Sequence, residues 1–144
     1  MSAKFFVDTN ILVYAHDRSA GEKHQRAKKV IAQLWESGRG VLSTQVLQEL
    51  CINLRRKSAN PLPIDEVRSL IREYSTWETV TNTPESVLRA LEIETRYQTS
   101  FWDALILQAA HEAGATILYS EDLARGQHYG AIQVVNPLVD LAAK

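Results

Sequence analysis

The sequence predicts an α/β sandwich built around a mainly parallel sheet of four to five strands. Short apolar runs alternate with amphipathic helical stretches, and parallel neighbouring strands need helical crossovers of this kind. The composition of the 144 residues is that of ordinary soluble domains, with 45% hydrophobic and 23% charged residues. Glycine and proline are sparse, and no low-complexity stretch or internal repeat occurs. We therefore expect one domain over residues 1–144.

The elements of the first half follow from apolar spacing and from residues that start or stop helices. Apolar side chains at helical spacing mark two long helices, Gly38 ends one of them, and the Asn60-Pro61-Leu62-Pro63 segment breaks the other. In order, we expect a strand at 4–7, a short helix at 11–14 capped by Asn10, a helix at 22–37, a strand at 41–43 and a helix at 44–58.

The second half repeats the alternation. Thr83 followed by Pro84 is typical of a helix start, and Gly114 follows the last apolar helical stretch. In order, we expect a helix at 64–74, a strand at 78–81, a helix at 84–97, a helix at 101–113 and strands at 116–119 and 132–135. In such sheets ligands bind beyond the carboxyl ends of the strands, so that edge is where chemistry is expected.

Several function classes lack their usual motifs. The single cysteine, Cys51, excludes an internal disulfide framework and a thiolate zinc cluster, which favours a reduced compartment. Asp8 interrupts the apolar run that a signal peptide needs, and no run approaches the roughly 20 residues of a membrane span. We expect a cytoplasmic protein with no membrane contact. Phosphate-loop, dinucleotide, serine-elbow and H-E-x-x-H zinc motifs are missing from the sequence.

Charge and aromatic residues suggest nucleic acid as a partner. Residues 1–57 hold ten Lys and Arg against five Asp and Glu, and the remainder reverses that balance. The run Arg55-Arg56-Lys57 is a candidate RNA contact, with a solvated helix face as the alternative. Trp77 and Tyr129 are candidates for stacking on bases, with core packing as the alternative.

Acidic residues stand at unusual places. Asp8 directly follows a buried strand, where it is either a turn residue or a site acid. Asp103 heads an apolar helical stripe, where an ionised carboxylate is costly unless it is paired, although Ser100 and Asp103 also fit a capping box. Glu49 lies off the apolar face of its helix, and Glu121 and Asp122 follow a strand. These acids have the spacing to converge on one edge of the sheet.

Four motifs in this order resemble those of PIN-domain ribonucleases, and more narrowly the VapC-type toxins of toxin–antitoxin pairs. They are Phe6-Val7-Asp8-Thr9-Asn10, the Ser43–Glu49 segment, Ser100-Phe101-Trp102-Asp103 with Ala104-Leu105-Ile106, and Ser120-Glu121-Asp122-Leu123. The resemblance covers essentially the whole chain. It implies a PIN-like three-layer α/β/α fold, magnesium- or manganese-dependent cleavage of RNA, a homodimer, and a small antitoxin that blocks the site.

The resemblance also assigns roles to residues. Asp8, Glu49 and Asp103 match three metal-site acids, and Asp122 matches the fourth, although Glu121 is an open alternative that spacing disfavours. Ser120 matches the hydroxyl that orders the turn, and Asn10 a polar supporting position.

Acids are suited to this chemistry because Mg²⁺ prefers carboxylate and water oxygens and lowers the pKa of a water that it binds. We expect in-line attack by water, leaving 5′-phosphate and 3′-hydroxyl ends.

Two other functions are compatible with the sequence. A haloacid-dehalogenase-like or receiver-like protein would form an aspartyl phosphate on Asp8, but the dehalogenase pattern has an acid two residues later, where this chain has Asn10. A non-catalytic PIN-like RNA-binding module would keep the fold and lack the nuclease activity. The four acids count against it, because negative charge near RNA weakens binding.

Overall fold

The chain forms a six-stranded sheet with helices on both faces, described in a computed structural model over residues 3–57, 59–123 and 126–139. The strands are β1 (Phe5–Val7), β2 (Gly40–Ser43), β3 (Glu78–Val80), β4 (Ile117–Tyr119), β5 (His128–Tyr129) and β6 (Ile132–Val135). The helices are α1 (Thr9–His16), α2 (Glu22–Ser37), α3 (Thr44–Ile52), α4 (Ile64–Tyr74), α5 (Pro84–Tyr97) and α6 (Phe101–Glu112), with a 3₁₀ turn at Arg18–Ala20 and a π-helix at Asn53–Lys57.

The sheet has the strand order β3-β2-β1-β4-β6-β5 and is parallel except for the last pair. The predicted mainly parallel sheet is therefore confirmed. It has one strand more than the four or five expected, because β5 adds an antiparallel edge in which His128 pairs with Gln133. A strand of two residues is too short to produce an alternating pattern in the sequence.

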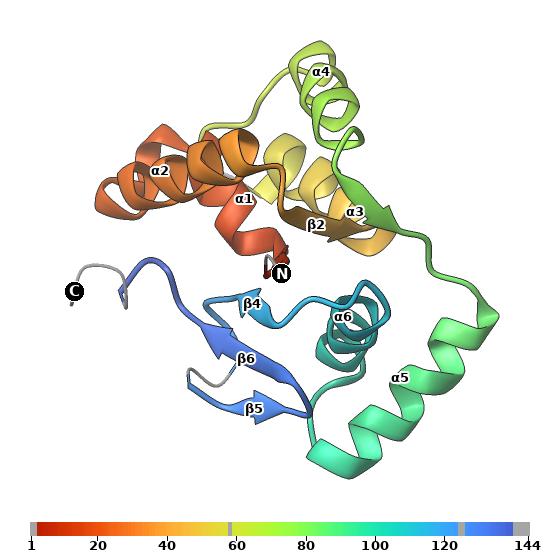
Figure 1. Cartoon of the computed structure of the whole chain (residues 1–144). Coiled ribbons are helices and arrows are strands. Elements are labelled where there is room, and N and C mark those ends of the chain that lie inside the picture. The colour runs from red at the N-terminus through yellow and green to blue at the C-terminus, as the bar shows by residue number, and fades with distance from the viewer. Residues whose placement is uncertain (1–2, 58, 124–125, 140–144) are drawn as a thin grey trace.

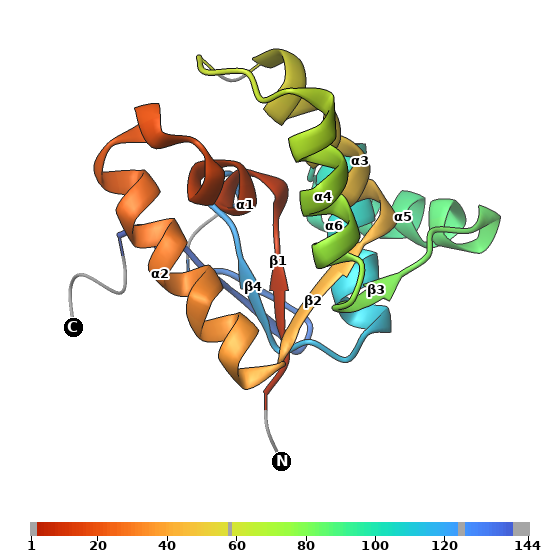
Figure 2. The same ribbon diagram turned by 90° about the horizontal axis from the view of Figure 1, so that it is seen from above.

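Two groups of helices cover the two faces of the sheet. Helices α1 and α2 pack on each other on one side, and α5 and α6 pack on each other on the opposite side (Figure 1). Seen from above, β1 runs between β2 and β4, and the chain turns into α1 and α3 directly where β1 and β2 end (Figure 2). The expected arrangement of helices on both faces of a mainly parallel sheet is confirmed, and it brings several strand ends to one edge.

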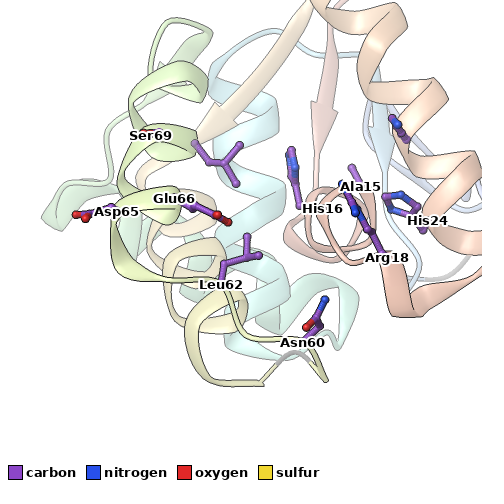
Figure 3. A pocket seen from close by; sticks show the side chains of 11 residues that line it. Ala15, His16, Arg18, His24, Asn60, Leu62, Asp65, Glu66 and Ser69 are labelled. Atoms are coloured by element: carbon purple, nitrogen blue, oxygen red, sulfur yellow. The ribbon is translucent and has the colours of Figure 1, made fainter.

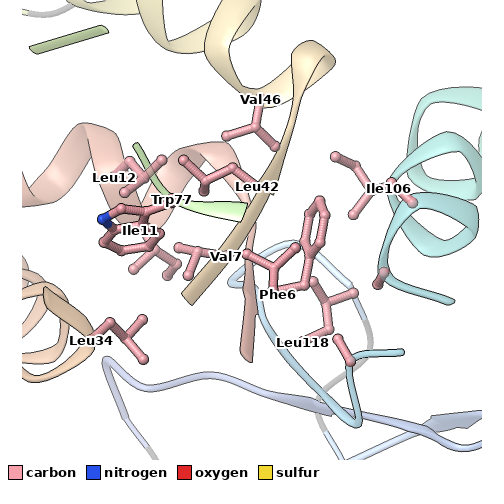
Figure 4. Close-up of a cluster of buried hydrophobic side chains, with 14 of the residues drawn as sticks. Phe6, Val7, Ile11, Leu12, Leu34, Leu42, Val46, Trp77, Ile106 and Leu118 are labelled. Atoms are coloured by element: carbon pink, nitrogen blue, oxygen red, sulfur yellow. The ribbon is translucent and has the colours of Figure 1, made fainter. Parts of the chain in front are cut away.

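The central strand β1 is buried on both faces. Phe6 and Val7 are fully buried and lie on opposite sides of the strand, Val7 toward Ile11 of α1 and Phe6 toward Ile106 of α6 (Figure 4). Each such side chain contributes about 1.5–3 kcal/mol of burial free energy. This double burial explains why the strand is a continuous apolar run, and why the acid that follows it emerges from the middle of the sheet.

Most predicted helix boundaries agree with the structure, and two need correction. Helix α1 is capped by Asp8, whose carboxylate accepts the N–H of Thr9, and not by Asn10. The helix expected over 44–58 ends at Ile52 and continues as the π-helix, and residue 58 lies outside the described residues. Thr83 caps α5 as predicted, with its hydroxyl accepting the N–H of Ser86.

Trp77 and Tyr129 are core residues, which corrects the expectation that they stack on bases. Trp77 is 9% exposed and lies so close to Gly40 that a Cβ there would collide with the ring. Tyr129 is 8% exposed and packs edge-to-face on Tyr97, with the ring centroids 5.0 Å apart. Within the described residues, no helix combines the length and apolar character needed to cross a membrane.

Candidate active site

A small acidic cavity lies at the carboxyl edge of the sheet. Its volume is about 210 Å³, and its walls come from the ends of β1 and β4 and from helices α1, α3 and α6. The four predicted metal-site acids line it together: Asp8, Glu49, Asp103 and Asp122. The other lining residues are Thr9, Asn10, Gln45, Asn53, Trp102 and Ile106. We call this space the acidic cavity.

Asp8 is the most deeply buried of these acids, with 8% of its surface exposed. One carboxylate oxygen accepts the N–H of Thr9 at 2.7 Å, and the other accepts the hydroxyl of Ser120 at 2.9 Å. Burial raises the pKa of Asp8 to about 6, aided by the negative charges of Glu49 and Asp122 and opposed by the two hydrogen bonds. The fold thus fixes this carboxylate, and neither of its described hydrogen-bond partners carries a positive charge.

Glu49 projects from α3 and is oriented by two neighbours. The hydroxyl of Thr9 donates to one carboxylate oxygen at 2.6 Å, and the amide of Gln45 donates to the other at 3.3 Å. The same amide donates to the backbone carbonyl of Trp102 at 3.4 Å, which ties α3 to the start of α6. Gln45 is 4% exposed, and its Oε1 has no hydrogen-bond partner within the described chain.

Asp103 lies in the first turn of α6, where its N–H donates to the hydroxyl of Ser100 at 3.1 Å. The Ser100 half of the predicted capping box is therefore present. Burial raises the pKa of Asp103, and the charges of Asp122 and Glu49 raise it further. A hydrogen bond with Ser100 opposes this rise, and the contribution of Asp122 and Glu49 arises because the three carboxyl groups share one cavity.

The side chains of the two acids after β4 have different partners. The carboxylate of Asp122 accepts the amide of Asn10 at 2.5 Å and lines the cavity. Glu121 accepts the Tyr14 hydroxyl at 2.6 Å and pairs with Lys23 at 2.6 Å, outside the cavity. Although burial acts to raise the pKa of Glu121, hydrogen bonds from Lys23 and Tyr14 hold it below its ordinary value. Glu121 is thus anchored to α1 and α2, while Asp122 faces the other acids.

Ser120 holds the turn that carries Asp122. Its side chain is fully buried, donates to Asp8, and accepts the N–H of Leu123 at 3.2 Å. This hydroxyl therefore links the end of β1 to the turn after β4. Its position agrees with the ordering role that the motif implies.

The described side chains of the basic run do not line the acidic cavity. Arg55 belongs to the π-helix and lines a separate groove with Cys51 and Ile64. Arg56 is exposed, and the side chain of Lys57 lies outside the described part of the structure. RNA contact by Arg55, Arg56 and Lys57 stays a prediction.

The acidic cavity has the donor set of a hard divalent cation. Its lining, as far as the structure describes it, includes no Lys, Arg or His, and its acids supply oxygen ligands only. Over the described ranges, no three His, Cys, Asp or Glu side chains approach closely enough to enclose a metal by themselves. Four carboxylates lining one cavity suit Mg²⁺ or Mn²⁺, because Mg²⁺ keeps several waters, and the Gln45 Oε1, which has no partner within the described residues, is a further acceptor there.

A larger groove lies between α1, α2 and α4 and differs in charge. It has a volume of about 790 Å³, and Lys28 is among its lining residues. His16, Arg18 and His24 lie on one side of it, and Asp65 and Glu66 on the other (Figure 3). The His16 ring is hydrogen-bonded to the Tyr74 hydroxyl at 2.6 Å. Burial lowers the pKa of His16, and the charge of His24 lowers it further. We call this space the α1–α4 groove, and its opposite charges offset one another.

Sequence reasoning missed five lining residues: Thr9, Gln45, Asn53, Trp102 and Ile106. Helical spacing offered a signal for two of them, since Gln45 and Asn53 lie four residues before and after Glu49. Thr9 and Trp102 are direct neighbours of predicted acids. Nothing in their local sequence indicates a hydroxyl aimed at Glu49 or an exposed indole.

Comparisons with known proteins identify the family and the fold. The family described as the PIN domain matches residues 5–125. The structure is similar to the sarcin–ricin-loop-cleaving toxin VapC20 of Mycobacterium tuberculosis, with a TM-score of 0.64, 22% identity, and coverage of 83% of this chain and 90% of that chain. It is also similar to a toxin–antitoxin complex from Klebsiella pneumoniae, with a TM-score of 0.66, 20% identity, and coverage of 94% and 98%. DNA-bound VapBC from Salmonella typhimurium gives a TM-score of 0.63, 16% identity, and coverage of 92% and 97%. No protein of curated function matches the chain.

Proposed function

Because the chain belongs to the PIN-domain family, we propose that it is a metal-dependent endoribonuclease and the toxin of a toxin–antitoxin pair. One observation carries the proposal: four carboxylates line one small cavity at the carboxyl edge of a parallel sheet, and no basic side chain is among the cavity's described lining residues. A binding surface for RNA alone would gain from fewer negative charges, since affinity for nucleic acid comes largely from phosphate neutralisation. Carboxylates gathered in this way favour the binding of a cation that would contact the RNA phosphate.

Asp8, Glu49, Asp103 and Asp122 would hold Mg²⁺ or Mn²⁺. The ion, when bound, would offset the carboxylate charges, activate water and stabilise charge on the phosphate under in-line attack. The chain's part is to position these ligands. Ser120 and the N–H of Thr9 fix Asp8, the Thr9 hydroxyl and Gln45 orient Glu49, and Asn10 orients Asp122.

The aspartyl-phosphate alternative fits this arrangement less well. A nucleophilic Asp8 would need a free oxygen directed at a phosphoryl group, whereas each of its oxygens accepts a hydrogen bond inside the protein and the side chain is 8% exposed. Labelling of Asp8 by acetyl phosphate would favour that alternative over hydrolysis.

The remaining parts of the proposal concern partners and setting. A small antitoxin would block the site, and the chain would form a homodimer in the cytoplasm, where its single cysteine stays reduced. The similarity to toxin–antitoxin complexes supports the antitoxin. Light scattering after size exclusion tests the dimer, which would have twice the 16.2 kDa mass of the chain.

The activity is tested by incubating the purified chain with a mixed pool of single-stranded RNA in Mg²⁺, Mn²⁺ or chelator. We expect cutting in metal only, with 5′-phosphate and 3′-hydroxyl ends. Cyclic-phosphate ends would contradict attack by water. RNA that binds but is never cut in any metal would favour the non-catalytic RNA-binding module.

A further inference from the structure

Trp102 is an exposed aromatic residue at the rim of the acidic cavity. It directly precedes Asp103 in the first turn of α6 and lines the cavity. Its side chain is 62% exposed, more than any other large hydrophobic side chain in the described part of the chain. A large apolar surface left in water beside a cluster of carboxylates needs an explanation, because aromatic residues are the ones that contribute most when buried.

The fold uses its other two tryptophans differently. Trp77 is buried, and Trp35, although 41% exposed, packs on Tyr74 and Trp77 with ring centroids 5.6 and 5.2 Å apart. Trp102 has one ring contact, edge-to-face with its neighbour Phe101 at 5.3 Å. The core therefore does not require the Trp102 indole.

Although its side chain is exposed, the Trp102 backbone is held in place. Its carbonyl accepts the amide of Gln45, which also donates to Glu49. Phe101 on one side packs against the small cluster of Ala90, Ala104 and Leu105. These contacts hold the backbone that carries the indole next to the carboxylates.

The acidic cavity offers a nucleobase few attractive contacts. Four carboxylates line it, and Trp102 at the rim is the aromatic side chain among its described lining residues. Unpaired bases of RNA are commonly held by stacking on aromatic side chains, and this contact tolerates any base because each has a flat face. A base next to the phosphate over the cavity would come within reach of the indole.

We propose that Trp102 stacks on an unpaired base beside the scissile phosphate and so positions the RNA over the acidic cavity. This inference rests on the proposed nuclease function and names a positioning contact for it. Stacking would supply affinity where the carboxylates repel the RNA backbone.

The test compares Trp102→Ala and Trp102→Phe with the wild type on one single-stranded RNA in Mn²⁺. Stacking predicts that Trp102→Ala raises KM about 5- to 100-fold with kcat little changed, and that Trp102→Phe restores most of the loss. Leu88→Ala, which removes a 56% exposed apolar side chain from α5, is the matched control and leaves KM unchanged.

A second readout locates the contact directly. RNA carrying 5-iodouridine at successive positions is irradiated with the Asp8→Asn variant in Mn²⁺, and cross-linked peptides are identified by mass spectrometry. We expect cross-links at Trp102 from one or two nucleotides beside the cut. If the wild type cuts RNA but Trp102→Ala has an unchanged KM and no cross-link forms at Trp102, the stacking proposal is wrong and the nuclease stands.

Two further outcomes would overturn the proposal in other ways. A Trp102→Ala protein whose mass falls from dimer to monomer, with KM rising in parallel, would assign Trp102 to a protein interface. A wild type that cuts no RNA in any metal would reject the nuclease itself, and the stacking contact with it.

Discussion

The acidic cavity and the α1–α4 groove differ in both size and charge. The groove has nearly four times the volume, about 790 against 210 Å³, and its lining includes Arg18 and Lys28 as well as Asp65 and Glu66. The cavity is small, and its described lining places four carboxylates together without a basic side chain. Volume alone would direct attention to the groove. The cavity is nevertheless the stronger candidate for a functional site. A buried charge that no described counter-charge offsets costs free energy until a ligand binds.

The largest difference in RNA cleavage between the two regions should appear when single acids in each are neutralised. Asp8→Asn and Asp103→Asn remove metal-site charge, and since such an ion is worth several kcal/mol in the transition state we expect RNA cleavage to fall about a thousandfold or more. Glu66→Gln makes the same kind of change in the groove and should leave the initial cleavage rate unaltered. An equal loss in the Glu66 variant would remove the distinction between the two regions.

A smaller effect is expected from the hydroxyl that orients Glu49. Thr9→Val keeps the shape of the buried side chain but removes the 2.6 Å hydrogen bond to Glu49. Loss of a partner that orients a metal ligand typically costs 10- to 100-fold, so we expect cleavage to fall by about that factor. Thr79→Val is the control, because its hydroxyl bonds the Trp77 carbonyl far from the cavity. Unchanged cleavage by Thr9→Val would show that Glu49 needs no such support.

Neutralising Asp8 should also stabilise the metal-free protein. The folded state raises the pKa of Asp8 from 3.8 to about 6, mainly through burial. The carboxyl is protonated in both states below pH 3.8, stability falls as pH rises from there to about 6, and the loss stays constant above. In chelator at pH 7.5, Asp8→Asn should therefore raise the free energy of unfolding by roughly 1–2 kcal/mol, part of the gain being lost with altered hydrogen bonds.

Urea unfolding at pH 7.5 and pH 4 measures this difference between Asp8→Asn and the wild type. The gain should shrink at pH 4, where the wild-type carboxyl is largely neutral. Glu66→Gln should show no such pH-dependent gain. A variant less stable than the wild type at pH 7.5 would contradict the idea of an uncompensated buried charge.

The smallest effect is expected at Glu121. Its carboxylate is held by Tyr14 and Lys23 outside the cavity, so Glu121→Gln should leave cleavage within about threefold of wild type. Breaking this partly exposed ion pair should cost about 1 kcal/mol of stability. Asp122→Asn, one residue on, should weaken Mn²⁺ binding measurably. The reverse pattern would make Glu121 the fourth metal-site acid.

The sequence was sufficient for features that depend on repeated or local patterns. Alternating strands and helices predicted the sheet, and the position of Asp8 after a buried strand predicted an acid at its edge. The spacing of Asp122 predicted which acid after β4 faces the others. The first two follow from periodicity and from the topology of parallel sheets, and the preference for Asp122 follows from the resemblance to the PIN-domain motif.

Features set by contacts between distant segments were not predictable in the same way. Asp8 caps α1 because the chain turns immediately after β1, and Asn10 is drawn instead to Asp122, which lies 112 positions away. Trp77 is buried because Gly40 leaves room for its ring, while Trp102 stays exposed. Composition treats the two tryptophans alike, and only tertiary packing distinguishes them.

Direct counting of bound Mn²⁺ by electron paramagnetic resonance tests the central claim, that the uncompensated carboxylates form a metal site. Wild type and Glu66→Gln should remove free Mn²⁺ signal as protein is added, and Asp8→Asn and Asp103→Asn should remove far less at equal concentration. Equal loss of signal by all four proteins, or none by the wild type, would contradict the claim.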